Sequence, residues 1–348
     1  MSNYSLALVF RGVSSINGTR SNTSALGPSR AELERFLPEV WMWVSSQLII
    51  TLFGTIANGL VVTAICRFKE VWHKFNLLLL SLATSSLLFN TFTIPTAALV
   101  LISRSYTSVI PVTWCRYFTY VQHSSSFVTT LSVCSISINR FVAVLFPVFY
   151  RKLYTRYTVA IFALPCWILP YVVGIFAMME ITGKYVALPP FGFCSSTGIH
   201  GFLVVTLFVY IPTALMGTCY CAIFVKLFVS RRTTVNAENS RKELKWILRR
   251  RRTSLAMFLS FLVFCCTYYP TTIHYAISPQ SSRNDPALFL WLRSLFYTAT
   301  KLNPIIYAST NPEFLNAFRA ILCCKGRRGE EPLQPATSKG SSATRRDG

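Results

Sequence analysis

Residues 112–142 read VTWCRYFTYVQHSSSFVTTLSVCSISINRFV, and positions 117–139 of this stretch carry no Asp, Glu, Lys or Arg. A helix crosses the hydrocarbon core of a bilayer, about 30 Å thick, with about 20 apolar residues. The stretch is therefore long enough to span a membrane as a single helix. Six further stretches are long, apolar and nearly free of charge, which gives the set 41–66, 75–102, 112–142, 157–179, 199–228, 252–278 and 286–309.

The composition also favours a membrane protein. Of the 348 residues, 52% are hydrophobic and only 13% are charged, and the mean hydropathy is +0.45. Such a chain is more apolar than an ordinary soluble domain. No repeat of roughly 20 to 50 residues is visible, which argues against a transporter built from duplicated halves. We expect an all-α membrane protein, a seven-transmembrane helix bundle over residues 41–310.

The net charge of +22 comes from basic residues that lie between the apolar stretches. They follow the first, third, fifth and seventh stretches, with the largest group in 226–252. Because Lys and Arg are enriched in cytoplasmic loops, these segments are predicted to face the cytoplasm and the N-terminus to lie outside. This placement argues against nucleic acid as a partner. It favours membrane lipids, since each basic residue near an anionic surface contributes about 1 kcal/mol.

The two terminal segments differ in character. Residues 1–40 carry N-x-S/T sequons at Asn3, Asn17 and Asn22, which predict an extracellular glycosylated N-terminus. Residues 311–348 begin with a short amphipathic stretch and continue as a tail rich in Ser, Thr, Pro and Gly, which predicts an eighth helix followed by a disordered cytoplasmic tail. Cys323 and Cys324 end the amphipathic stretch, where paired cysteines suit palmitoylation; two buried thiols are the alternative.

Two further cysteines lie on the predicted outer side. Cys115 begins the third apolar stretch, and Cys194 lies in the loop between the fourth and fifth. Both would face an oxidising compartment, which favours a disulfide between them. Such a bond would hold the loop over the outer end of the third helix.

Six of the seven apolar stretches also carry a distinctive polar residue, proline or aromatic group. In order along the chain these are Asn58; Cys115 and Asn139-Arg140-Phe141; Trp167 and Pro170; Pro212 and Tyr220; Phe264 and Pro270; and Asn303-Pro304-Ile305-Ile306-Tyr307, followed by Phe314 and Phe318. At these spacings the set resembles the rhodopsin-like (class A) G protein-coupled receptors across nearly the whole membrane-embedded chain. The Asn-Arg-aromatic form resembles a branch that contains moody and trapped-in-endoderm receptors, with melatonin receptors as relatives.

The resemblance implies a receptor of the plasma membrane that passes the binding of an extracellular ligand to a heterotrimeric G protein when helix six moves, with arrestin as a second partner at the tail. An arginine at the membrane edge needs water or a polar partner, and simple snorkelling of Arg140 is the alternative to a signalling role. The residues implied in coupling and activation are Asn139, Arg140, Phe141, Tyr220, Phe264, Tyr268, Pro270, Asn303, Pro304 and Tyr307.

Several positions depart from the family pattern. Asn139 stands where an acidic residue usually precedes the arginine, and an amide cannot pair its charge, so signalling without ligand is expected. Ser86 replaces the aspartate of the inner sodium site, so sodium is expected to bind poorly. Tyr268 replaces the usual tryptophan of the helix-six switch. Lys301 adds a cation inside the seventh stretch, where it is either a functional group or a buried lysine satisfied by polar neighbours.

The same comparison constrains the ligand without identifying it. Gln122 occupies the position at which amine receptors carry an aspartate, so a protonated monoamine would lack its counter-ion. A neutral small molecule, a lipid and a peptide remain open. The candidate pocket consists of Gln122, His123, Ser126, Tyr269, His274 and Tyr297. Some of these side chains could instead bond between helices as packing groups.

Rival functions fit less well. An opsin would need its retinal lysine about one turn outward of Lys301, where Tyr297 stands. A channel or transporter that uses Lys301 in a polar pathway would lack buried carboxylates to relay ions. An enzyme is not expected, because no metal-ligand spacing, phosphate loop or nucleophile arrangement is present. No cofactor and no metal are predicted.

Overall fold

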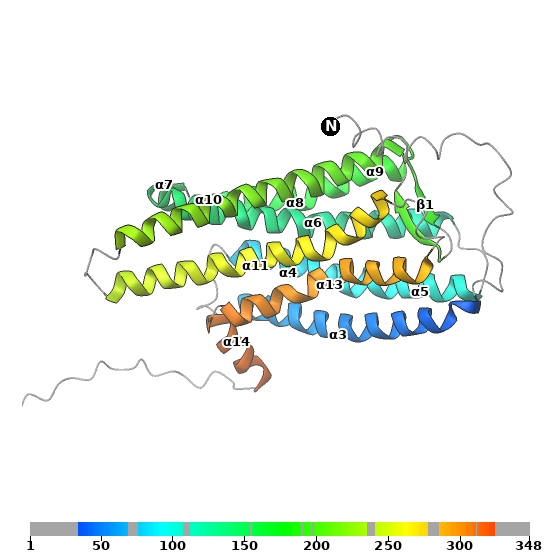
Figure 1. Ribbon diagram of the computed structural model, residues 1–348, viewed down its shortest axis with the longest axis horizontal. Coiled ribbons are helices and arrows are strands. Elements are labelled where there is room, and N and C mark those ends of the chain that lie inside the picture. The colour runs from blue at the N-terminus through cyan, green and yellow to red at the C-terminus, as the bar shows by residue number, and fades with distance from the viewer. Residues whose placement is uncertain are drawn as a thin grey trace, which may run out of the picture.

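The chain folds as a bundle of long helices that run side by side (Figure 1), as seen in a computed structural model that describes residues 34–68, 76–106, 112–153, 155–188, 191–196, 198–234, 241–277, 285–310 and 312–323. The first half contains α3 (Leu37–Arg67), α4 (Asn76–Leu88), η2 (Phe89–Thr93), α5 (Ile94–Tyr106), α6 (Val112–Leu145) and α7 (Pro147–Leu153). The second half contains α8 (Arg156–Met178), β1 (Tyr185–Leu188), β2 (Phe193–Ser196), α9 (Gly198–Val205), η3 (Thr206–Tyr210), α10 (Ile211–Thr234), α11 (Arg241–Ile277), α13 (Pro286–Thr310) and α14 (Pro312–Leu322).

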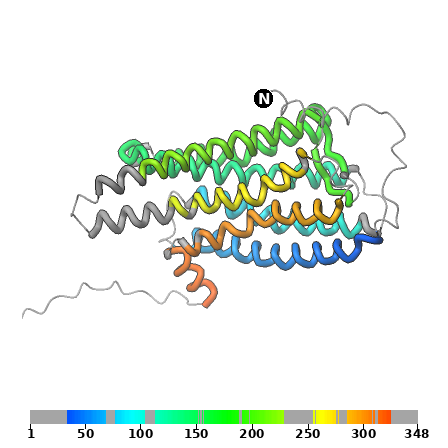
Figure 2. The backbone as a smooth tube through the Cα atoms, viewed as in Figure 1, coloured from blue at the N-terminus to red at the C-terminus, as the bar shows by residue number. Residues whose placement is uncertain are grey.

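The two ends of the bundle are easily told apart. The antiparallel strands β1 and β2, with Tyr185 opposite Ser196, lie at one end, which we call the hairpin end. The amphipathic helix α14 turns away from the bundle axis at the other, the α14 end (Figure 1). In Figure 2, α13 lies between α3 and α11, and it contacts both helices.

Five helical stretches in the described part of the chain are long and apolar enough to cross a bilayer: Leu37–Arg67, Leu77–Ser103, Thr113–Leu145, Tyr157–Met178 and Gly198–Leu227. The helices α11 and α13 have comparable lengths and lie alongside them. They are more polar because α11 begins with a basic segment, while α13 contains Arg293 and Lys301. Large apolar side chains such as Ile49, Ile161 and Val225 remain more than 60% exposed on the bundle surface, as expected of a surface that meets lipid.

Two of the predicted spans contain π-helical turns that their sequences did not reveal. Pro95 follows the start of α5 by one residue, and Pro212 does the same in α10. Proline lacks the N–H that would bond the carbonyl four residues earlier. Those carbonyls belong to Thr91 and Phe208, both inside the π-helical segments. The wider turn therefore accommodates the missing bond in each helix.

The buried core has a distinct composition at each end. The hairpin end packs Trp43, Phe89, Phe193 and Tyr297 into one aromatic cluster. The α14 end packs aliphatic side chains of α3, α4, α6 and α10 with Tyr220 and with Phe314 of α14. The apolar face of α14, which includes Phe314, packs on this cluster, and this packing explains why α14 lies against the bundle.

Candidate functional site

A buried polar cluster lies at the hairpin end, where α6 meets α13. Gln122 Nε2 donates to the Tyr297 hydroxyl over 3.1 Å, and Arg293 Nε donates to the same oxygen over 3.2 Å. Gln122 and Tyr297 are buried, while Arg293 keeps part of its surface accessible. The structure thus brings together two of the predicted pocket residues and adds an arginine that the sequence analysis did not include.

The hairpin covers this cluster. Cys115 and Cys194 form the predicted disulfide, with their Cα atoms 5.3 Å apart, so β2 is attached to the start of α6. The Phe193 ring then lies 4.5 Å from the guanidinium carbon of Arg293, close enough for a cation–π contact. Phe193 also packs edge-on against Trp43, whose ring centroid lies 5.9 Å away.

His123 lies beside the cluster on α6. Its ring contacts Phe127 and Tyr185, at centroid distances of 5.8 Å and 6.1 Å. Tyr185 belongs to the hairpin, and burial raises the pKa of its phenol, so this hydroxyl stays neutral and donates to the Gly174 carbonyl. Ser126 is half-buried on the same helix. The side chains that surround His123 are therefore aromatic and uncharged.

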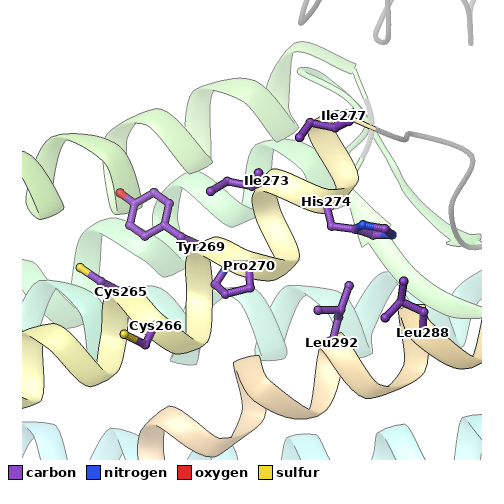
Figure 3. A pocket seen from close by; sticks show the side chains of 9 residues that line it. All are labelled: Cys265, Cys266, Tyr269, Pro270, Ile273, His274, Ile277, Leu288 and Leu292. Atoms are coloured by element: carbon purple, nitrogen blue, oxygen red, sulfur yellow. The ribbon is translucent and has the colours of Figure 1, made fainter.

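The remaining predicted pocket residues lie elsewhere. Tyr269 and His274 line a groove of about 540 Å³ between α11 and α13 (Figure 3), together with Cys265, Cys266, Pro270, Ile273, Ile277, Leu288 and Leu292. Several members of this lining are exposed, so the groove opens on the outside of the bundle. The residues predicted for one pocket therefore fall into two sets, the buried cluster at Gln122 and the groove at His274.

One signal in the sequence could have identified Arg293. An ionisable residue inside a membrane helix is costly, by about 3 kcal/mol for arginine at the helix centre, and usually marks a functional site. The same rule distinguishes Lys301 in the sequence, and it applies equally to Arg293, which lies two turns nearer the hairpin end and is absent from the predicted pocket. Its orientation toward Tyr297 and Phe193 required the fold.

Lys301 lies deeper in the bundle and is 1% exposed. Its Nζ donates to the Tyr297 carbonyl over 2.6 Å. A Cβ added at Gly54 would lie 2.6 Å from Lys301 Cγ and 3.0 Å from Asn90 Nδ2. Only glycine at position 54 leaves room for the lysine, and the structure satisfies its ammonium with a backbone carbonyl.

The neighbouring amides tie three helices together at this depth. Asn58 Nδ2 donates to the carbonyls of Gly54 and Thr300, over 2.8 Å and 3.1 Å. Thr300 Oγ1 donates to Asn90 Oδ1 over 3.1 Å. Ser86 of α4 is also fully buried. The region that would hold sodium in the family pattern thus contains amides, hydroxyls and an ammonium group.

A column of aromatic rings leads from the buried polar cluster at the hairpin end toward the middle of α11. The ring of Tyr268 stacks on Phe264 at 5.4 Å and meets Phe296 edge-on at 5.6 Å. Phe296 in turn contacts Tyr297 at 5.6 Å. Pro270 interrupts α11 two residues beyond Tyr268. A proline kink beside this column gives α11 a place to bend.

The arginine of the third helix lies at the α14 end. Asn139 is buried and Arg140 is half-buried there, with Phe141 beside them. Ser137 Oγ donates to the Tyr220 hydroxyl over 2.9 Å, which holds the phenol against α6, and Arg140 lies within electrostatic range of Tyr220. Asn303 and Pro304 are buried in α13, and the side chain of Tyr307 lies outside the described part of the chain.

The predicted modification sites lie mostly outside the described part of the chain. Asn3, Asn17, Asn22 and Cys324 lie outside the described residues. Cys323 is described and is exposed at the end of α14 with a free thiol. Exposure leaves this thiol accessible for acylation.

Several known proteins are similar to this chain over most of its length. A family profile described as "7 transmembrane receptor (rhodopsin family)" matches residues 57–307. The 5-hydroxytryptamine receptor 4 of Cavia porcellus is 26% identical over 81% of this chain and 80% of that receptor. The melatonin receptor type 1B of Homo sapiens is 25% identical over 87% of this chain and 84% of the receptor. The receptor moody of Drosophila melanogaster is 22% identical over 85% of this chain and 53% of its own length.

The matched region begins within α3 and ends within α13, so it includes part of each of these two helices and all the long helices between them. The helices α11 and α13 therefore cross the membrane together with the five more apolar ones. Members of the family are receptors, not enzymes, and both the family and these relatives imply a G protein and an extracellular ligand. The chain belongs to the rhodopsin family of seven-transmembrane receptors and is a G protein-coupled receptor.

Proposed function

We propose that this receptor binds its ligand at the buried cluster of the hairpin end and couples to the G protein through Arg140 at the α14 end. The observation that carries the proposal is the ring column between the two regions. Tyr297 contacts Phe296, Phe296 contacts Tyr268, and Tyr268 stacks on Phe264. A ligand that displaces Tyr297 would shift the ring of Tyr268 and with it the kinked helix α11.

The proposal includes an orientation in the plasma membrane. The hairpin end would face the outside, because its disulfide requires an oxidising compartment. The basic segments that follow the first, third, fifth and seventh helices would face the cytoplasm. The tail beyond Cys323 contains Ser338, Ser341, Ser342 and Thr344, and phosphorylation of such residues would create negative charge for arrestin.

The proposed ligand is not a protonated monoamine, although the names of several relatives refer to amines. Gln122 is uncharged and bonds to Tyr297. The Tyr297 hydroxyl also accepts a hydrogen bond from the cation Arg293, which would repel an ammonium group. A ligand of the amine class would meet a positive charge here instead of a carboxylate.

The experiment that tests coupling compares basal G protein activation by wild type and Arg140→Ala at equal surface expression. Dissociation of a panel of G protein heterotrimers would be measured in cells without added ligand. We expect wild type to exceed an empty-vector control, and Arg140→Ala to fall to the control level, because the guanidinium is the group that contacts the G protein.

Arg319→Ala is the matched control, since Arg319 is an exposed arginine on α14 at the same end of the bundle. This variant is expected to signal as wild type does. Equal activity of wild type and Arg140→Ala would contradict the proposed role of Arg140. Wild-type activity no higher than the vector control would contradict signalling without ligand.

A further inference from the structure

We infer that the ligand of this receptor carries a carboxylate on an apolar body and that Arg293 is the group that binds the carboxylate. The inference rests on the proposed ligand site at the hairpin end. It begins with the charge of Arg293, which lies inside a membrane helix and holds a single protein hydrogen bond among the residues that the structure describes, from Nε to Tyr297. The terminal N–H groups on both Nη atoms have no such acceptor there.

Among the described residues the hairpin end holds the carboxylates of Glu34, Glu39, Glu180 and Asp285, and none of them pairs with Arg293. Glu180 pairs with Arg116. Asp285 accepts a hydrogen bond from the Leu288 amide at the start of α13 and lies eight residues, or about 12 Å of helix, from Arg293. Glu39, at the start of α3, has a buried Oε2 that forms no hydrogen bond in the described structure, and it does not reach Arg293. A membrane-embedded arginine without a protein counter-ion is the condition that an anionic ligand would relieve.

The hydroxyl of Tyr297 supplies a second donor in the same place. Its oxygen already accepts from Gln122 Nε2 and from Arg293 Nε. A phenol has one proton of its own, and no hydrogen bond of the described residues uses it, although the Oε1 of the adjacent Gln122 amide also lacks a partner. Tyr297 and Arg293 therefore present donors to one region, which favours a ligand that is rich in acceptors.

Two observations favour a carboxylate over a phosphate and an apolar body over a polar one. A single guanidinium balances a single negative charge and matches the two oxygens of a carboxylate, whereas a phosphate ester carries more charge than Arg293 neutralises. The surroundings are aromatic, with Phe193 stacked near the guanidinium and with Tyr185 beside His123. A ring or a hydrocarbon chain attached to the carboxylate would meet these surfaces.

The test measures binding and does not need a G protein, so its outcome is independent of the coupling experiment. Purified full-length receptor in lipid nanodiscs would be heated with two matched sets of probes: indole-3-acetate, indole-3-acetamide and tryptamine, and decanoate, decanamide and decylamine. Each set keeps the body and changes the head group from anion to neutral amide to cation. The concentration that gives half of the maximal thermal stabilisation reports affinity.

We expect a carboxylate of at least one set to stabilise the wild type, and the amide and the amine of that set to bind at least about tenfold more weakly. Arg293→Gln should weaken binding of that carboxylate by about tenfold or more, and Arg293→Lys should have an intermediate effect, because it keeps the charge but loses the paired donors. The control Arg116→Gln removes an outer arginine that has its own partner, Glu180. It should bind the carboxylate as wild type does.

Three results would overturn the inference: stabilisation by no carboxylate at millimolar concentration, stronger binding of an amine or an amide than of the carboxylate with the same body, or undiminished carboxylate binding by Arg293→Gln. A folded variant is recognised by its own melting transition without a probe. If Arg293→Gln does not fold, Arg293→Lys and Tyr297→Phe provide the comparison, since each retains the packing and reduces the number of donors.

Discussion

At the scale of single residues, the departure from the family pattern at position 139 has a measurable consequence. An amide can donate to or accept from a neighbouring group, but it does not neutralise a guanidinium. Asn139 is 7% exposed and precedes Arg140 at the α14 end. A carboxylate at position 139 would hold Arg140 inside the bundle more strongly, because a partly buried ion pair is screened less than an exposed one.

We therefore expect Asn139→Asp to lower signalling without ligand by about threefold to tenfold, which corresponds to about 0.7 to 1.4 kcal/mol of additional stability for the resting state. Basal dissociation of G protein heterotrimers at equal surface expression is the measurement. Asn139→Gln keeps the amide and is the control, which should stay within about twofold of wild type. An Asn139→Asp receptor more active than wild type would show that the carboxylate does not restrain Arg140.

Arg293 and Lys301 show which single residues sequence reasoning can recover. Both are charges in a membrane helix, so both stand out by the same physical rule. The rule does not say whether the charge faces the ligand end or the middle of the bundle. That depends on rotation of α13 against α3 and α6, which only the packed structure shows through the contacts to Tyr297, Phe193 and Gly54.

At the scale of helices, the contact of α3 with α13 depends on Gly54. The Cβ of an alanine there would overlap Lys301 Cγ, which is close to the backbone and cannot move away as a side-chain terminus could. Forcing additional volume into a packed interior costs about 1–3 kcal/mol. We expect Gly54→Ala to lower the apparent melting temperature of the purified receptor by several degrees.

The double variant tests whether Lys301 is the cause. Lys301→Ala removes the Cγ that lies 2.6 Å from the added Cβ and keeps its own Cβ at 3.2 Å. Gly54→Ala should therefore cost less in that background than in wild type, with a coupling of about 1 kcal/mol or more. Gly59→Ala serves as the control, because an added Cβ at Gly59 would meet nothing within 4 Å. Equal destabilisation by Gly54→Ala with and without Lys301 would place the clash elsewhere, for example on Asn90.

Helices were predictable from the sequence to within a few residues, whereas their irregular parts were not. The predicted third span, 112–142, corresponds to α6 at Val112–Leu145, and the predicted fourth, 157–179, to α8 at Arg156–Met178. The predicted sixth span, 252–278, corresponds to the apolar part of α11, and the helix begins earlier, at Arg241, because it continues past the membrane edge where apolarity ends. Hydropathy records burial in lipid, so it cannot show π-helical turns or a short hairpin.

At the scale of the whole molecule, the orientation is predicted by two independent physical effects. The basic residues follow the first, third, fifth and seventh apolar stretches, and Lys and Arg in short loops favour the cytoplasm. The disulfide between Cys115 and Cys194 would place the hairpin in a compartment in which disulfides persist. Charge and redox chemistry thus assign the same end to the outside, although neither depends on the other.

This agreement predicts the accessibility of both ends of the chain in cells. With an odd number of spans, an epitope tag placed before Met1 and one placed after Gly348 must lie on opposite sides of the membrane. We expect antibodies to stain the first tag on intact cells and the second only after permeabilisation, with a co-expressed cytoplasmic protein as the control for membrane integrity. The reverse pattern would place the hairpin end in the cytoplasm, where its disulfide would be reduced, and would remove the basis for a ligand site there. Staining of both tags on intact cells would mean an even number of spans, and the assignment of α11 or α13 as membrane-crossing would then be wrong.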